Sequence, residues 1–387
     1  MDKPQTPPLR FKGFTGDWKE KNLGTVVEII GGGTPDTTIP EYWNGDIDWY
    51  SPSEIGDKVF VNESVRKITA LGLQKSSATI LPANKTVLFT SRASIGDMAI
   101  LTKQGTTNQG FQSFVVGPRL NIYFLYSIGF KIKEYALKRA SGSTFLEVSK
   151  SVLSQMEFLA PQLPEQAQIG DFFRQLDQQI AQARAVWEKS IQLKKAMLAK
   201  MFPVSGSLKP EIRFKGFIGD WERKRLGDVA TIKTGISNRE DSDSTGKYTF
   251  FDRSQDVRKS NRYLYDCEAV IMAGEGSEFL PKYFVGKFDL HQRSYAIMDF
   301  QECSSLFMFY YLHLMNDYFC NQAVGSTVKS LRLPMFTEMP IILPTTKKEQ
   351  TQIGNFFRQL DKTIALQAAE LEKLNQLKKG LLSVMLV

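Results

Sequence analysis

Two long stretches of the chain place apolar residues at steps of three and four positions. In the first stretch these residues are Ile169, Phe173, Leu176, Ile180, Ala183 and Trp187, and in the second they are Ile353, Phe357, Leu360, Ile364, Leu371 and Leu374. A helix brings such positions onto one face, and a stripe this narrow is typical of a coiled-coil seam. We therefore predict one long helix within residues 161–203 and a second within residues 344–387.

The ends of both predicted helices carry recognisable signals. Pro164 and Glu165 suit the first turn of the first helix. Thr346 and Glu349 have the spacing of a capping box, in which each side chain bonds to the backbone amide of the other. Pro203 ends the first helix, because proline cannot continue the hydrogen-bond ladder. A helix of about 38 residues would be about 57 Å long.

The segments that precede these helices have a different pattern. Short apolar runs broken by Gly, Asn and Ser predict strands at residues 86–90, 114–116 and 269–272, and helix is expected around 123–138 and 306–319. The predicted fold class is therefore α+β, with two tandem mixed α/β domains that are each followed by a long helix.

The chain is an internal duplication. The sequence of Arg10 to Trp18 returns almost unchanged at Arg213 to Trp221, an offset of 203 (10 to 213). Residues 169–177 return at 353–361, an offset of 184 (169 to 353). Leu193-Lys-Lys195 keeps that offset at Leu377-Lys-Lys379. Two near-identities of nine residues in the same order establish the repeat.

The offset changes inside the repeat. Asn108-Gln109 corresponds to His291-Gln292 at an offset of 183, as do the two Gly-Ser-Thr elements at 142–144 and 325–327. The first copy therefore carries 20 extra residues (203 against 183) before residue 108. We expect most of them between Gly31 and Phe60.

Equal helices after unequal domains suggest a two-part recognition protein. An antiparallel pair of the helices would form a coiled-coil spacer of pseudo-two-fold symmetry with one domain at each end. Such an arrangement suits two DNA half-sites at a fixed separation, because successive turns of one groove lie about 34–36 Å apart. The net charge of +8 and the pI near 9.1 favour an anionic partner such as nucleic acid.

Composition excludes several other classes. Cys267, Cys303 and Cys320 show neither metal-type spacing nor a disulfide framework, and His291 and His313 are the only histidines. No stretch approaches the roughly 20 apolar residues of a membrane span. The sequence therefore predicts a soluble cytoplasmic protein with no membrane partner, no metal and no cofactor.

Four motifs together resemble a known family. They are Arg-Phe-x-Gly-Phe-x-x-x-Trp at 10 and 213, the stretch from Gly32 to Trp43, the Gly-Ser-Thr elements, and Glu-Gln-x-x-Ile-Gly-x-Phe-Phe-x-x-Leu-Asp in both helices. In this order, across residues 9–387, they resemble the specificity subunit of type I restriction-modification systems. The second copy departs from the pattern, since Thr234-Gly-Ile-Ser237 and an acidic run at 240–243 replace Gly-Gly-Thr-Pro.

The resemblance implies an organisation and a set of partners. Residues 1–160 and 213–343 would be target-recognition domains, 161–203 and 344–387 helical spacers, and 204–212 a linker, in a circular arrangement. Double-stranded DNA, two methyltransferase subunits and the restriction (motor-nuclease) subunits would be the partners. The chain itself would read an asymmetric bipartite target and hold no catalytic residue.

Candidate DNA contacts are the side chains that commonly reach base edges and phosphates. In the first domain they are Arg92, Ser94, Asn108, Gln109, Gln112, Ser143, Thr144 and Lys150. In the second they are Glu275, Ser277, His291, Gln292, Arg293, Ser326, Thr327, Lys329 and Arg332. Arg92 aligns with Glu275, and such an exchange would alter base preference because Arg suits guanine whereas Glu accepts from cytosine. Any one of these residues could instead cap its own turn.

Candidate seam and docking residues lie on the two helices. They are Ile169, Phe172, Phe173, Leu176, Ile180, Trp187, Ile353, Phe356, Phe357, Leu360, Ile364 and Leu371. In each Phe-Phe pair one ring would fill the seam and the other would face the domain or a methyltransferase subunit. Arg174 and Asp177 stand three apart and could pair, as could Arg358 and Asp361.

Three other functions are possible for a chain of this kind. A methyltransferase or nuclease would need an adenine-flipping motif, a cofactor-binding Gly-x-Gly turn or an Asp…Glu-x-Lys triad, and the sequence has none of these. A standalone DNA-binding regulator would be expected to carry a compact helix-turn-helix. A duplicated coiled-coil scaffold without restriction-modification partners would not need an excess of basic over acidic residues.

Overall fold

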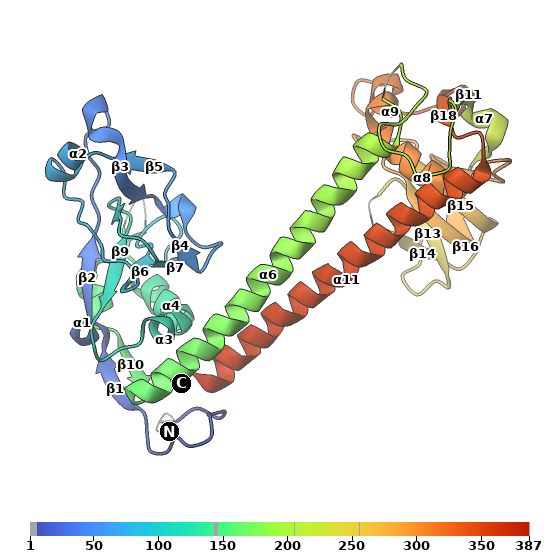
Figure 1. The fold of residues 1–387 in the computed structure, drawn as a ribbon. Coiled ribbons are helices and arrows are strands. Elements are labelled where there is room, and N and C mark those ends of the chain that lie inside the picture. Colours follow the sequence, from blue (N-terminus) through green and yellow to red (C-terminus); the bar gives the residue numbers. More distant parts are fainter. Residues whose placement is uncertain (1–5, 143–145, 205, 255, 387) are drawn as a thin grey trace. The chain divides into compact units, whose positions relative to one another are not determined.

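The computed structural model describes residues 6–142, 146–204, 206–254 and 256–386. Its contacts divide the chain into two compact units, Met1–Ala183 with Glu370–Val387 (unit 1) and Arg184–Ala369 (unit 2). Each unit therefore contains one mixed α/β domain and a segment of each long helix, and Figure 1 labels the elements.

A five-stranded sheet forms the centre of unit 1. Its order is β2 (Val27–Gly31), β9 (Gln112–Val116), β6 (Thr86–Phe89), β7 (Met98–Leu101) and β4 (Phe60–Val61), and only β4 and β7 are parallel. Both faces are covered, because Val87 and Phe89 enter one apolar core while Leu88 enters another. A second sheet has the order β5 (Arg66–Ile68), β3 (Trp43–Tyr50) and β8 (Thr106–Thr107).

Short elements complete unit 1. A ribbon of β1 (Lys19–Asn22) and β10 (Glu157–Ala160) leads into the long helix α6 (Leu163–Met201). The others are α1 (Leu23–Val26), η1 (Pro40–Tyr42), η2 (Pro52–Glu54), α2 (Ala70–Gln74), α3 (Ile122–Ser127), α4 (Gly129–Arg139) and α5 (Lys150–Ser154). The helix expected around 123–138 is present as two helices, α3 and α4, because the chain turns at Ile128 (ψ 5°).

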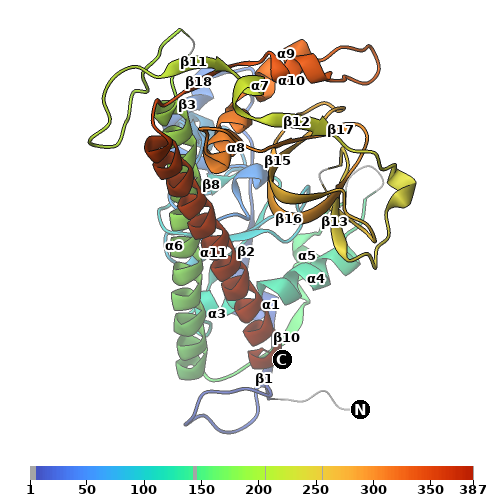
Figure 2. The ribbon, with the colours of Figure 1, turned by 90° about the vertical axis from the view of Figure 1, so that its right-hand side faces the viewer.

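Unit 2 repeats this plan with a six-stranded sheet. The order is β12 (Thr231–Thr234), β17 (Ser294–Met298), β15 (Tyr265–Ala273), β16 (Lys282–Leu290), β13 (Tyr248–Phe251) and β14 (Arg258–Ser260). Figure 2 shows α8 (Ser305–Leu314) beside β15 and β16. The remaining elements are α7 (Leu226–Val229), η3 (Arg239–Asp241), α9 (Asn316–Gln322), α10 (Leu333–Thr337) and the ribbon of β11 (Glu222–Arg225) with β18 (Pro340–Leu343). The helix predicted over 306–319 is likewise broken, at Met315.

Strand pairing locates the extra residues of the first copy. Asn108 N donates to Tyr50 O, and its counterpart His291 N donates to Phe251 O. Tyr50 therefore corresponds to Phe251, and the offset at this point is 201 (50 to 251). In the neighbouring strands Trp49 pairs with Arg66, and its counterpart Phe250 pairs with Arg258. Arg66 therefore corresponds to Arg258, and the offset there has fallen to 192 (66 to 258).

The insertion therefore extends further along the chain than the expected interval, Gly31 to Phe60. Two of the 20 residues lie before Tyr50 (203 to 201) and nine between Tyr50 and Arg66 (201 to 192). The last nine lie between Arg66 and Val87, because Val87 corresponds to Val270 at an offset of 183 (87 to 270). The inserted region contains η2, β4 and α2, none of which has a labelled counterpart in the described part of unit 2.

The long helices α6 (Leu163–Met201) and α11 (Lys347–Met385) are each 39 residues long. Near its start each buries a glutamate, 1% exposed, against an arginine of its own unit: Glu165 with Arg10 and Glu349 with Arg213, both at 2.6 Å. The predicted capping box is therefore only half correct. Glu349 N donates to Thr346 Oγ1, but the Glu349 carboxylate binds Arg213, because a buried charge needs an opposite one.

The far end of each helix enters the core of the unit in which it ends. Met201 and Phe202, at the end of α6, are buried with Trp221 in unit 2. Met385 and Leu386, at the end of α11, are buried in unit 1. Each helix therefore begins in one unit and ends in the other.

Two glycines of α11 give a matched test of the helix-to-domain contact. A Cβ built on Gly354 would lie 2.8 Å from Leu306 Cβ and 2.9 Å from Phe307 N, whereas one built on Gly380 meets nothing within 4 Å. We expect Gly354→Ala to lower the free energy of unfolding by about 1–3 kcal/mol through overpacking. Gly380→Ala should raise it by about 0.5–1 kcal/mol through helix propensity. Urea unfolding measures both, and a shift of the same sign in the two variants would contradict the close packing at Gly354.

Candidate nucleic-acid interface

Two adjoining hollows in unit 2 collect most of the candidate residues of the second domain. The first, of about 470 Å³, is lined by Asn238, Arg239, Glu240, Asp252, Arg253, Glu275, His291, Gln292 and Arg293. The second, of about 480 Å³, is lined by Arg253, Ser254, Glu275, Gly276, Ser277, Thr327, Val328 and Lys329. Arg253 and Glu275 belong to both. Ser326 and Arg332 are exposed but line neither hollow.

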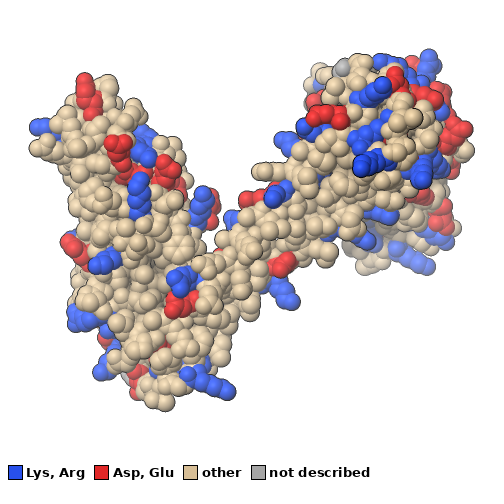
Figure 3. Space-filling view, in the orientation of Figure 1, with Lys and Arg blue, Asp and Glu red and all other residues tan. Residues whose placement is uncertain are grey.

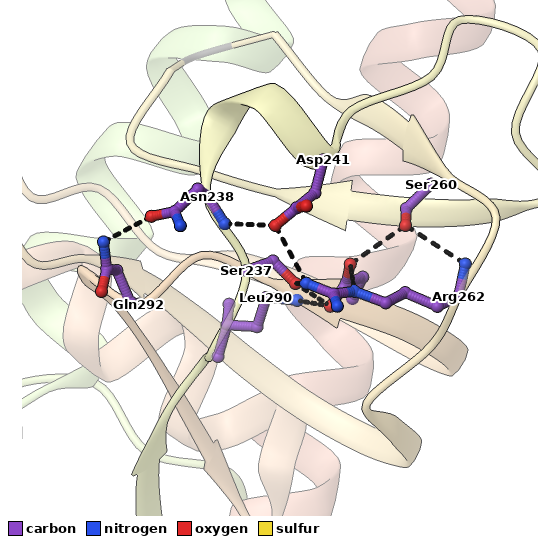
Figure 4. Close-up of polar contacts among 8 residues, drawn as sticks. Ser237, Asn238, Asp241, Ser260, Arg262, Leu290 and Gln292 are labelled. Carbon is purple, nitrogen blue, oxygen red and sulfur yellow. Dashed lines mark hydrogen bonds and ion pairs between the residues drawn. The ribbon is translucent and has the colours of Figure 1, made fainter.

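Polar contacts around a buried carboxylate fix one wall of the first hollow. Figure 4 shows Arg262 bonded to Ser237 and Asp241 in this network. Asp289 is fully buried and accepts from Ser237 Oγ at 2.6 Å and from Ser260 Oγ at 3.0 Å. Arg262 bonds to Asp289, Ser237 and Asp241 together. This network holds the loop that carries Asn238, Arg239 and Glu240, so the polar wall is attached to the sheet.

Glu275 organises the boundary between the two hollows. Its side chain is only 12% exposed and accepts from Arg253 at 3.3 Å and from Arg293 at 2.5 Å. The two arginine side chains are 53% and 59% exposed. Glu275 is therefore occupied by two cations, and it does not stand as the free acceptor expected from the sequence.

His291 lies beside this group as a neutral ring. Its Nδ1 accepts from Arg293 N at 3.1 Å, which leaves no proton on that nitrogen. Burial lowers the pKa of His291 below its usual range. The imidazole is therefore a hydrogen-bonding group and not a charge at neutral pH.

The candidates of the first domain are less concentrated. Arg92 is half-buried, and its backbone pairs with that of Glu147. Asn108 Oδ1 accepts from Gly110 N, and Gln109 contacts Thr34. Ser94 is half-buried and follows Ala93, whose backbone is left-handed (φ 63°). The buried Oε1 of Gln112 has no hydrogen-bond partner among the described residues. Lys150 is exposed and lines a separate hollow with Gly24 and Ser154, while Ser143 and Thr144 lie outside the described residues.

The glycine loop of the first domain is a structural feature. A Cβ on Gly32 would come within 1.9 Å of Asn108 O, and one on Gly235 within 1.8 Å of Leu290 O. Both copies therefore need glycine where β8 or β16 passes. Trp49 Nε1 donates to Gly33 O at 2.8 Å, which ties this loop to the small tryptophan core of unit 1.

Sequence reasoning missed part of the unit 2 surface. Asn238 and Arg239 lie between the two parts of the stretch where the second copy departs from the family pattern, and Glu240 begins its acidic run, so that departure was the available signal. Asp252 and Arg253 lie in no motif. Strand pairing of β13 with β16 and of β16 with β15 brings Arg253 to Glu275.

Half of the predicted seam residues are buried within the units. The buried ones are Ile169, Phe173, Leu176, Ile180, Ile353 and Phe357, while Phe172, Trp187, Phe356, Leu360, Ile364 and Leu371 are half-buried. Phe172 stacks edge-on against Phe11, and Phe356 does so against Phe214. The second ring of each pair thus lies on its own domain.

The expected helical ion pairs were wrong. Arg174 pairs with Asp171, and Arg358 donates to Asn355. Asp177 instead accepts from Tyr123 at 2.7 Å and pairs with Lys378, and Asp361 accepts from Tyr310 at 2.7 Å and pairs with Lys194. Each aspartate takes the partners that packing brings to it, whereas the exposed arginine three residues earlier bonds elsewhere on its own helix.

Surface charge does not by itself locate a DNA path. On the face shown in Figure 3, basic and acidic side chains lie interspersed on both domains. Within the described ranges no helix is long and apolar enough to cross a membrane. The same ranges hold no cluster of three or more metal-binding side chains.

Removing the buried charge of Asp289 tests the wall of the first hollow. We expect Asp289→Asn to lower the free energy of unfolding by about 1–3 kcal/mol, because Arg262 and the two serines lose a charged acceptor. Amide exchange at residues 238–241 should quicken. Asp266→Asn is the control: Asp266 lies in the same sheet, 55% exposed and 3.9 Å from Lys287, and should change stability by less than about 0.5 kcal/mol. Unaltered exchange in the Asp289 variant would argue against the network.

Comparison with known proteins places the chain in a family. A family model described as "Type I restriction modification DNA specificity domain" matches residues 15–186 and 218–376, one stretch in each copy. The Type I restriction enzyme MjaIX specificity subunit of Methanocaldococcus jannaschii is 34% identical over 235 residues, which are 57% of this chain and 53% of that protein. The EcoDI specificity subunit of Escherichia coli is 30% identical over 41% of this chain and 35% of that protein. The chain thus matches about half and about a third of the length of these relatives.

Solved structures share the fold. The S subunit of a type I restriction-modification system from M. genitalium superposes with a TM-score of 0.66 at 15% identity, over 99% of each chain. A chain from a study of complex assembly and conformational transition of the type I R-M system gives 0.53 at 17% identity, over 94% of this chain and 96% of that one. Because the family model matches both copies and covers most of the sequence, this protein belongs to the family of type I restriction-modification DNA specificity subunits.

Proposed function

We propose that this chain is the sequence-reading subunit of a type I restriction-modification complex, and that it recognises an asymmetric bipartite DNA target without doing chemistry itself. One observation carries the proposal. The two units share much of their strand pairing, yet equivalent loop positions hold different chemistry, such as Arg92 against Glu275. Equal frames with unlike loops suit two unlike half-sites.

The long helices would serve as the spacer between the half-sites. The Asp177–Lys378 contact lies in unit 1 and the Lys194–Asp361 contact in unit 2. From Asp177 to Lys194 is 17 residues along α6, and from Asp361 to Lys378 is 17 residues along α11 in the reverse order. This equality supports an antiparallel coiled-coil pair with pseudo-two-fold symmetry. A helix of 39 residues would span about 58 Å.

The methyltransferase and restriction subunits would supply the chemistry. Docking would use exposed apolar residues of the helices, since the predicted seam residues are largely occupied within the units. Leu193 and Leu377 are the best candidates, because they occupy equivalent positions and are 46% and 50% exposed. Two equivalent leucines suit two identical methyltransferase subunits.

The cytoplasmic location expected from the sequence stays a prediction.

A standalone DNA-binding protein and a duplicated scaffold are the alternatives. Membership of the specificity-subunit family disfavours both, because the family model matches the two copies separately. The paired polar hollows of unit 2 also suit recognition better than a purely structural role.

Methylation mapping tests the proposed function. In cells that carry the partner methyltransferase, adding this chain should produce modified bases at one interrupted sequence whose two halves differ. Single-molecule sequencing of the DNA with and without the gene reads this directly. The purified chain alone should methylate nothing. A continuous or palindromic motif, or an unchanged methylation pattern, would refute the proposal.

Substitution of the exposed leucines tests the docking surface. We expect Leu193→Asp and Leu377→Asp each to weaken binding of a methyltransferase subunit about ten-fold or more, because a charge enters an apolar contact. Native mass spectrometry of the assembled complex counts the bound subunits. Gln192→Asp is the matched control, since Gln192 is the exposed neighbour of Leu193. Full assembly of both leucine variants would exclude this surface.

A further inference from the structure

One set of three positions has different side chains in the two domains, and its central position changes from Arg92 to Glu275; we call this set the exchange trio. In unit 2 it consists of Arg253, Glu275 and Arg293, and in unit 1 of Pro52, Arg92 and Gly110. Backbone contacts establish two of the matches. Arg92 bridges Glu147 as Glu275 bridges Ser330, and Ser91 N donates to Gly110 O as Gly274 N donates to Arg293 O.

The third match follows from the strand next to it. Asn108 N donates to Tyr50 O, and His291 N donates to Phe251 O. Two residues further along stand Pro52 in unit 1 and Arg253 in unit 2. Pro52 indeed lies at Gly110, because a Cβ built on that glycine would come within 2.8 Å of Pro52 Cγ.

The unit 2 trio is a carboxylate holding two guanidinium groups. Glu275 binds one Nη1 of Arg253 and one of Arg293, and each arginine side chain remains more than half exposed. A guanidinium has five N–H donors, so most of them stay available. The shared carboxylate fixes the rotamers and partly neutralises the charge, which lowers the ordering cost of a directional contact.

The unit 1 trio has a single central guanidinium. A Cβ on Gly110 would lie 3.4 Å from Arg92 Nε and 3.0 Å from Asn108 Oδ1, so the glycine leaves room for the arginine. Among the described residues no carboxylate pairs with Arg92. Both trios therefore carry one net positive charge. The guanidinium donors, however, come from the central position in unit 1 and from the two flanking positions in unit 2.

We propose that the exchange trio is where each domain reads one base pair of its half-site: Arg92 in the first domain, and Arg253 with Arg293 in the second. Glu275 is the positioning residue. Arginine bonded twice to guanine O6 and N7 is the commonest specific base contact, and it needs an oriented guanidinium. The inference rests on the proposed function and adds that these residues set specificity and do not merely bind phosphate.

Variants of the full complex test this assignment. Arg92→Gln should relax one base pair of the first half-site about ten-fold or more and leave the second half-site unchanged. Arg293→Gln should do the reverse. Methylation logos from sequencing give both readouts. Arg92→Lys keeps the charge but loses the fork, and should relax the same position as Arg92→Gln.

Glu275→Gln should change two measured quantities in opposite directions, which a purely structural role would not produce. Loss of the carboxylate frees two guanidinium charges, so affinity for non-specific DNA should rise while discrimination in the second half-site falls. Lys259→Gln is the matched control, because Lys259 is exposed in unit 2, lines neither hollow and should leave the logo intact. Filter binding against salt concentration measures the non-specific affinity.

The outcomes separate this inference from the proposed function. If the arginine variants weaken binding to all sequences equally and reduce the salt slope by about one, the residues contact phosphate and the inference is overturned. An unchanged logo in every trio variant also overturns it, while the bipartite motif of the wild-type complex leaves the proposed function standing. Absence of a bipartite motif in the wild type would instead refute the proposed function.

Discussion

An ion pair between an aspartate of each long helix and a lysine of the other is the constraint on which the remaining structure depends. Asp177 is 6% exposed, accepts from Tyr123 of its own domain and pairs with Lys378, which comes from the helix of the other copy. Burial raises the pKa of Tyr123, and the charge of Asp177 raises it further, so the phenol remains a donor. Apolar seams tolerate slippage, but a buried charge deprived of its partner costs about 3–5 kcal/mol. These contacts therefore fix which turns of α6 and α11 meet.

The residues shared by the two helix sequences serve mainly to attach each helix to its own domain. Glu165 and Glu349 bind the arginine that opens each copy. Gln166 Oε1 accepts from Asn121 N, at the start of α3, as Gln350 Oε1 accepts from Ser304 N, at the start of α8. Gly170 and Gly354 allow that close approach. Near-identity of the repeats thus has an internal explanation, and a partner surface has to be sought among the residues that remain exposed.

Much of this architecture was accessible from the sequence, for physical reasons that also explain the failures. Long periodic segments and exact repeats are read directly, so both helices and the family membership followed. The breaks at Ile128 and Met315 were not readable, because the apolar pattern continues through them. The full extent of the insertion was not readable, because only strand pairing matches Tyr50 to Phe251 and Arg66 to Arg258. Arg253 carries no local signal, since Glu275, its partner, stands 22 residues away and reaches it through the sheet.

The two domains also show how loops can diverge while the frame stays constant. Each buries an aspartate in the same region, but from different strands: Asp48 of β3 in unit 1 and Asp289 of β16 in unit 2. By strand register, Asp48 stands where unit 2 has Thr249, and Asp289 stands where unit 1 has Thr106. Burial alone would raise the pKa of Asp48, but bonds from Ser64 and Lys103 outweigh it and hold that pKa low. Moving the carboxylate to a neighbouring strand preserves one satisfied buried charge. It also reassigns the partner loops, so the surface above can change its chemistry without unfolding the sheet below.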